Sequence, residues 1–269
     1  MITFLIYKYE ELKLNFKVYW KENFYFIFCL VITSGFYFGI FKLMPKMLED
    51  TSFLTTGIVF IVYIVFIFLF FLISHITLIG HLQGNAIQIT TKQFPEVYYL
   101  LESQCETLGI KRLPTLYLIQ SGGILNAFAT RLAGKNYVVL YSDIFEKAYS
   151  DGMDVVEFIL AHELTHLKRN HILKRLLVFP ANIILLLSFA YSRACEVTCD
   201  SFASEISPSG STRGLVLLSA GTSLYSKVNI EEYLSNANKR KTFAKWLSEI
   251  LSTHPHISKR IDKLMEQQK

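Results

Sequence analysis

The chain has 269 residues, 52% of them hydrophobic and 18% charged, and its mean hydropathy of +0.34 is high for a water-soluble enzyme. These values favour a membrane protein with one globular domain. The net charge of +5 is not gathered into a basic arm; nucleic-acid binding is therefore not expected, and anionic lipid is the simpler partner. Four cysteines without a CxxC pair argue against a disulfide scaffold and fit a reducing cytoplasm.

Two apolar runs near the start of the chain are predicted to cross a membrane. Residues 24–41 carry no charged side chain, and residues 53–80 contain a single ionisable group, His75. Each run can cross a hydrocarbon core of about 30 Å. Buried core helices are the alternative, but neither run has a polar stripe, and the first run lacks the position and flanks of a cleaved signal peptide. We expect a transmembrane hairpin over 24–80, with spans at about 24–44 and 53–80.

Lysines flank the first run unevenly. The N-terminal segment 1–23 has four, whereas the loop between the runs has two that acidic neighbours offset: Lys8, Lys13, Lys17 and Lys21 against Lys42 and Lys46. The positive-inside rule therefore predicts a cytoplasmic N-terminus. Because two spans return the chain to the same side, we expect a multi-pass protein of the cell membrane whose globular part, 81–269, lies on the cytoplasmic side.

The globular part begins with a helix over 94–109, with Pro95 suited to its first turn and Gly109 to its C-terminal end. Three β-prone runs and two helices follow, at 115–120, 126–132, 136–141, 142–149 and 154–171. A helix, a small antiparallel sheet and then further helices together predict an α+β fold.

The stretch AHELTHLKRNH contains two histidines four residues apart. His162 and His166 would share one helix face about 6 Å apart, so both imidazoles can bind the same metal ion. Glu163 would stand beside that ion, where a carboxylate can take a proton from water, as in the HExxH zinc peptidases. A chance match, expected in roughly one such chain in a hundred, is the alternative. The apolar residues before the motif disfavour it, because two unpaired histidines are costly to bury.

A catalytic zinc normally takes three protein ligands. The metzincin pattern would need Gly at 169 and His at 172, but the chain has Arg169 and Ile172. His171 is one position too early and is expected to face elsewhere. The candidate is Glu196, with Asp200 one helical turn beyond it.

The segment 173–191 is apolar enough to suggest a third span. A span would leave Glu196 across the membrane from His166, where the two cannot share an ion. A helix running to Phe179, a break at 180–182 and a return helix bring Glu196 back, since each arm is roughly 20 Å long at 1.5 Å per residue. We therefore predict an apolar helical hairpin whose tip dips into the bilayer surface.

Taken together, five stretches resemble a known family. FPEVYYLLE, NAFAT, HELTHLKRNH, RACEVTCD and STHPHISKRI occur in the order found in the HtpX-like and CAAX-prenyl-endopeptidase-like integral membrane zinc metallopeptidases. The resemblance covers roughly residues 85 to 265. It implies a zincin-like, gluzincin-type domain with one Zn²⁺ per chain, bound by His162, His166 and Glu196, with Glu163 as general base and acid.

The resemblance also implies further roles. Asp200 would orient a histidine ligand, and Arg260 would pair with an acidic group such as Asp200. His254 could donate to the developing oxyanion. The edge strand in NAFAT would bind a substrate peptide by β-augmentation, through Asn126, Ala127, Phe128 and Ala129.

Two departures limit the carry-over. HtpX-type members have two full spans between HExxH and the glutamate, and the prenyl-protein endopeptidases have more spans around a closed chamber; this chain has room for neither, so the substrate does not transfer. Cys195 and Cys199 flank Glu196, and thiolates are good zinc ligands, although small core-facing cysteines are the more common case.

The sequence thus predicts a membrane-anchored zinc metalloendopeptidase that cleaves membrane-associated proteins or peptides. A catalytically silent membrane protein that keeps zinc for stability is the alternative, and a structural site would not need Glu163. A transporter would need repeated spans that the chain lacks.

Overall fold

The computed structural model describes residues 16–120, 122 and 126–267. The predicted cytoplasmic segment 1–23 is therefore described only from residue 16 onward, and Lys8 and Lys13 lie outside the described residues.

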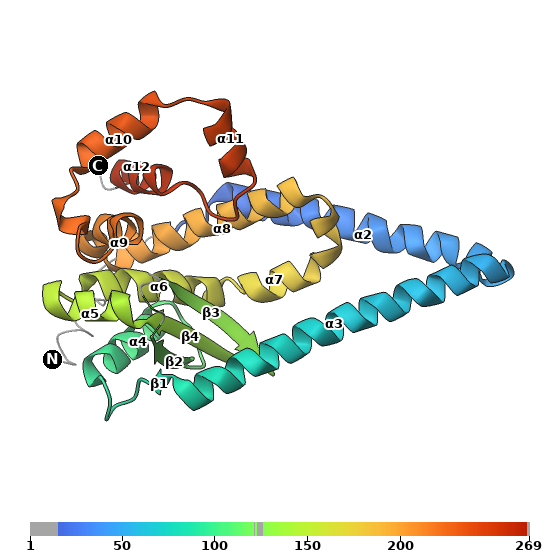
Figure 1. The fold of residues 1–269 in the computed structure, drawn as a ribbon, viewed down its shortest axis with the longest axis horizontal. Coiled ribbons are helices and arrows are strands. Elements are labelled where there is room, and N and C mark those ends of the chain that lie inside the picture. Colours follow the sequence, from blue (N-terminus) through green and yellow to red (C-terminus); the bar gives the residue numbers. More distant parts are fainter. Residues whose placement is uncertain (1–15, 121, 123–125, 268–269) are drawn as a thin grey trace.

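Two long helices, α2 (Trp20–Glu49) and α3 (Thr51–Asn85), project as a pair from a domain of shorter elements (Figure 1). Both are long and apolar enough to cross a membrane. Each continues beyond the predicted span, since only Asp50 separates the two helices. The Asp50 carboxylate accepts a hydrogen bond from the Ser52 N–H and so caps α3.

The sheet is small and mixed. It has four strands in the order β1-β2-β4-β3: β1 (Ile87–Gln88), β2 (Thr115–Ile119), β3 (Ala127–Leu132) and β4 (Lys135–Tyr141). The prediction of an antiparallel sheet was wrong at one pairing, because β2 and β4 run parallel. After β2 the chain crosses to the outer edge, forms β3, and returns through a tight turn at Ala133 and Gly134, so that β4 inserts between β2 and β3.

The two faces of the sheet pack on different helices. Val138 and Leu140 of β4 are fully buried in the main core with α4 and α6. Val139, between them in sequence, faces the other way and packs with Ile79 and Leu82 near the end of α3. The end of α3 therefore packs directly on the sheet.

Helices make up the rest of the domain. They are α4 (Pro95–Thr107), α5 (Ser142–Asp151), α6 (Asp154–Lys168), α7 (His171–Leu177), α8 (Leu185–Ile206), α9 (Pro208–Ala220), α10 (Ile230–Lys239), α11 (Phe243–Ile250) and α12 (Ile257–Gln267), with short 3-10 turns η1 (Phe179–Ile183) and η2 (Tyr225–Lys227). The predicted helix over 154–171 ends earlier, at Lys168. Asn170 takes a left-handed conformation with φ 54°, which breaks the helix and starts α7 in a new direction.

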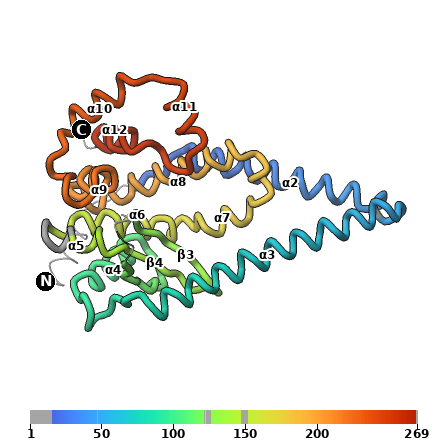
Figure 2. Tube along the Cα trace, in the orientation of Figure 1, coloured from blue at the N-terminus to red at the C-terminus, as the bar shows by residue number. Residues whose placement is uncertain are grey.

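The chain reverses direction between α7 and α8. After η1, α8 runs back along α6, and α2 lies beside both η1 and α8 (Figures 1 and 2). Val178 and Ala181 are buried against α2 and α8, together with Cys29 and Tyr191. Apolar side chains on the opposite side of this turn are exposed, including Leu177, Phe179, Ile183 and Leu185.

Candidate metal centre

Helix α6 carries the HExxH motif through the middle of the domain. Its residues from Val155 to Thr165 are all buried, and α9 lies close against its first turn. Gly210 of α9 makes this approach possible, because a β-carbon there would overlap the Asp154 carbonyl oxygen. The motif therefore stands on a rigid, fully packed element, as a precise site requires.

Three side chains converge at the interface between α6 and α8. The Nε2 atoms of His162 and His166 lie 3.3 Å apart, and the Glu196 carboxylate lies 3.3 Å from the first and 3.4 Å from the second. Atoms bound to one zinc at about 2.0–2.1 Å in a tetrahedral arrangement lie about 3.3 Å apart. The three groups thus already have the mutual spacing of a shared coordination shell and could hold a metal ion.

Cys199 offers a competing set with the two histidines, since ligand atoms of all three lie within 4.8 Å of one another. Its Sγ atom, however, lies 3.8 Å from Nδ1 of His171, which itself contacts Nδ1 of His166. Cys199 is thus associated with the Nδ1 side of His166, whereas both Nε2 atoms face Glu196. Without a metal, burial and the nearby Glu196 carboxylate raise the pKa of the Cys199 thiol well above its usual value. We therefore favour Glu196 over Cys199.

Two charged residues, Asp200 and Arg260, lie on the Nδ1 side of His162. Its Nδ1 atom lies 3.0 Å from the Asp200 carboxylate. Arg260 donates two hydrogen bonds to the same carboxylate, of 2.6 and 2.7 Å. The predicted pair of Asp200 and Arg260 is therefore present, and it holds the imidazole with Nε2 toward Glu196.

Buried opposite charges shift the pKa values of this network. Burial alone would lower the pKa of His162, but its hydrogen bonds and proximity to Asp200 and Glu196 outweigh burial and raise it to about 10. Burial would raise the pKa of Glu196, yet His162 and His166 hold it well below the usual range. Without a metal, the negative charges of Asp200 and Glu196 thus favour a protonated, cationic His162.

A cavity of about 210 Å³ opens onto these groups. Glu163, His162 and Glu196 line it, with Asn126 and Ala127 at the start of β3 on one side and His254 on another. His254 is largely exposed, and its Nε2 atom lies 3.6 Å from a Glu196 oxygen.

Strand β3 is an edge strand, as the NAFAT resemblance implied. Its far end is covered, because His75 of α3 contacts the Arg131 carbonyl oxygen at 3.1 Å. Of the four residues expected to bind substrate, Phe128 and Ala129 do not line the cavity: Phe128 packs on the α3 side of the sheet and Ala129 on the main core.

Two residues near the centre were not assigned a role from the sequence. His171, expected to face elsewhere, contacts His166, with their Nδ1 atoms 3.0 Å apart. Its other ring nitrogen lies 3.2 Å from the carboxylate of Glu22, a fully buried residue in the first turn of α2. Arg169 also donates to Glu22, at 2.8 Å. The sequence feature that could have predicted this contact is Glu22 itself, an acidic residue at the start of an apolar helix, because such a charge needs a partner.

The sequence model of peptidase family M48 matches residues 91–190 and 177–268. The two matches together span 91–268, more than half of the 269 residues. The chain belongs to peptidase family M48. The matched residues include the HELTH helix, Glu196 and the Asp200–Arg260 pair. Of the residues described at this centre, only Glu22 lies outside the match.

A search of curated proteins finds no match. Among solved structures, the chain is similar to the crystal structure of Ste24p from S. mikatae, with 15% sequence identity and a TM-score of 0.41. The match covers 88% of this chain but 63% of the Ste24p chain, so the chain spans less than two thirds of that protein.

Proposed function

We propose that this M48 peptidase is a membrane-anchored, zinc-dependent endopeptidase. The observation that carries the proposal is the convergence of His162, His166 and Glu196 at 3.3–3.4 Å, beside a carboxylate at the cavity wall. Two nitrogen ligands and one oxygen ligand, with room for a further group, are the usual donor set of a catalytic zinc site. The two long apolar helices support the membrane anchor.

A zinc ion held by these three residues would act as a Lewis acid toward the peptide carbonyl and toward water. Glu163 takes the proton from the attacking water and passes it to the leaving amine. Asp200, fixed by Arg260, holds His162 in the orientation that leaves Nε2 free for the metal. His254 stands at the cavity mouth, where it donates to the carbonyl oxygen as negative charge develops.

The open end of β3 supplies the means of holding a substrate. Asn126 and Ala127 line the cavity, and among the described residues no strand pairs with the outer side of β3. A peptide that pairs with this edge would run past Glu163 in an extended conformation. Because the site lies in a domain attached to two apolar helices, we expect the substrates to be membrane-associated proteins or peptides.

Cleavage of an internally quenched peptide library by the purified protein in detergent tests the activity. Glu163→Gln should reduce the rate about 10²–10⁴-fold, because it removes the proton-transfer group. Glu146→Gln, an equivalent change at an exposed position of α5, should have no effect. A catalytically silent zinc protein would show no cleavage that depends on Glu163, whichever peptides are tried.

A further inference from the structure

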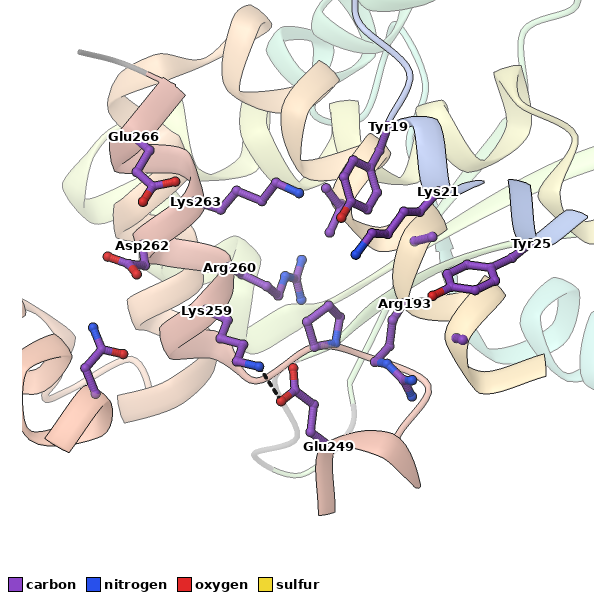
Figure 3. Close-up of a pocket in the computed structure, with 15 residues that line it drawn as sticks. Tyr19, Lys21, Tyr25, Arg193, Glu249, Lys259, Arg260, Asp262, Lys263 and Glu266 are labelled. Atoms are coloured by element: carbon purple, nitrogen blue, oxygen red, sulfur yellow. Dashed lines mark hydrogen bonds and ion pairs between the residues drawn. The ribbon is translucent and has the colours of Figure 1, made fainter. Parts of the chain in front are cut away.

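A second cavity, of about 510 Å³, shares Arg260 with the candidate active site but contains none of the proposed metal ligands. Its walls are the first turns of α2, one face of α8 and the length of α12, with α11 at the rim (Figure 3). Ala190 and Ala194 line it on α8, where small side chains leave room for a ligand. The proposed peptidase chemistry gives this cavity no role.

Cations outnumber carboxylates around this cavity. Five lining side chains are cationic and three are acidic: Lys21, Arg193, Lys259, Arg260 and Lys263 against Glu249, Asp262 and Glu266. Several of these charges are already engaged. Lys259 pairs with Glu249, Arg260 with Asp200, and Arg193 donates to the backbone carbonyls of Ile250 and Ser252.

Lys21 and Lys263 are different, because neither forms an ion pair with a carboxylate among residues 16–267 that the structure describes. Their amino groups lie 6.0 and 3.5 Å from the ring centroid of Tyr19, which brings the two positive charges together. Burial, and then the charge of Lys21, lowers the pKa of Lys263 and outweighs the opposite effect of Asp200 and Glu266. Figure 3 shows both side chains and Arg260 pointing into the cavity, with Asp262 turned toward its outer side. The centre of the cavity is therefore suited to an anion.

The surroundings of the cavity indicate where that anion comes from. Lys21 is in the first turn of α2, a helix apolar enough to cross a membrane, and the neighbouring Trp20 is exposed. Leu186 of α8, one turn before Ala190 in sequence, is also exposed, as is Trp246 of α11. Exposed aromatic side chains at the end of an apolar helix are typical of the membrane interface, at the depth of the lipid head groups.

We propose that this cavity binds the phosphate of an anionic phospholipid head group, with Lys21 and Lys263 as its ligands. Basic pockets beside membrane helices bind anionic head groups, and charge-assisted hydrogen bonds to phosphate are strong. The tyrosines at positions 19 and 25 line the same wall and can contact the glycerol part. This inference does not depend on peptidase activity.

Native mass spectrometry of the full-length protein, released from detergent, tests the proposal. The protein is titrated with dioctanoyl phosphatidylglycerol, with dioctanoyl phosphatidylcholine, and separately with inorganic phosphate. We expect one phosphatidylglycerol to bind at least about tenfold more tightly than phosphatidylcholine, given about 1 kcal/mol for each basic side chain near the head group. Lys21→Gln combined with Lys263→Gln should abolish this preference.

Two further variants make the result specific to the cavity. Lys92→Gln combined with Lys111→Gln removes the same charge from exposed loops that do not line the cavity, and should leave the preference intact. Ala190→Phe fills the cavity while keeping both lysines, and should abolish the preference without lowering the melting temperature. Equal affinity for the two lipids, an unchanged preference in the Lys21 and Lys263 variant, or inorganic phosphate binding as tightly as phosphatidylglycerol would each overturn the proposal.

Discussion

His162 is the residue at which the two charged layers of the site meet. Its Nε2 atom faces His166 and Glu196, and its Nδ1 atom faces Asp200, which Arg260 holds in turn. A proton on Nδ1, shared with Asp200, leaves the Nε2 lone pair available for a metal. The same two carboxylates stabilise a second proton when no metal is bound, so metal and proton compete for one position.

This competition predicts how the metal-free protein responds to pH. The pKa of His162 is about 10 in the folded protein against an ordinary value of 6.5. Its contribution to stability is therefore fully present below pH 6.5 and is lost as the pH rises through 10. In chelator, the free energy of unfolding should fall across this range by at most about 1.4 kcal/mol per pH unit from this group. Denaturant titrations at several pH values measure the fall, which should be absent from His162→Gln.

At the scale of elements, α2 contacts the candidate site and is also long and apolar enough to cross a membrane. Its buried Glu22 contacts His171 and Arg169, and His171 contacts His166, a proposed metal ligand. The first apolar helix is therefore linked to the candidate metal centre through two side chains.

Replacing Glu22 with Gln should consequently destabilise the domain. The change removes the charged acceptor of the Arg169 hydrogen bonds; because Arg169 is partly exposed and can be solvated, the cost should be about 1.5–3 kcal/mol. We expect a lower melting temperature in detergent together with weaker zinc binding. Glu49→Gln, at the exposed opposite end of α2, is the matched control. If Glu22→Gln bound zinc with unchanged affinity, the contact through His171 would have no part in shaping the site.

The turn between α7 and α8 gives a prediction about substrates. Its exposed apolar side chains suit insertion into the bilayer surface, where each is worth roughly 1.5–3 kcal/mol. Phe179, Ile183 and Leu185 are exposed, whereas Val178, from the same apolar run, is buried against α2 and does not belong in the test.

Changing Phe179, Ile183 and Leu185 to Ser should therefore leave zinc content unchanged. Cleavage of a membrane-embedded substrate should fall far more than cleavage of a short soluble peptide, with both rates measured in liposomes. Equal losses on the two substrates would indicate that this turn does not act as a membrane contact.

At the scale of the whole molecule, the sequence predicts the local elements better than their arrangement. The strands of the sheet except β1, and the helices α4 to α6, lie within a few residues of their predicted positions, because each depends on local periodicity and turn residues. The parallel pairing of β2 with β4 depends on where the crossover places β3, which periodicity does not encode. The spacing of the HExxH helix predicts His162 and His166, and the resemblance supplies Arg260. Glu22 could not be placed, because 147 residues separate it from Arg169.

The orientation in the membrane can be tested on the whole protein. A cysteine at Glu49, the last residue of α2, should be labelled by an impermeant maleimide from outside intact cells, following the positive-inside rule. The four native cysteines are buried and should not react under the same conditions. A reporter that folds only in the cytoplasm should be active after Lys269. Labelling of position 49 only after lysis would place the peptidase domain on the outer face.

Zinc stoichiometry of two purified variants tests the central claim most directly. Glu163→Gln should retain one zinc per chain while losing activity, because Glu163 lines the cavity and moves a proton without binding the metal. Glu196→Ala should lose the zinc, because it removes the carboxylate that lies 3.3 and 3.4 Å from the two Nε2 atoms. Cys199→Ser should retain the metal. Stoichiometric zinc in Glu196→Ala, together with its loss from Cys199→Ser, would contradict the proposed centre.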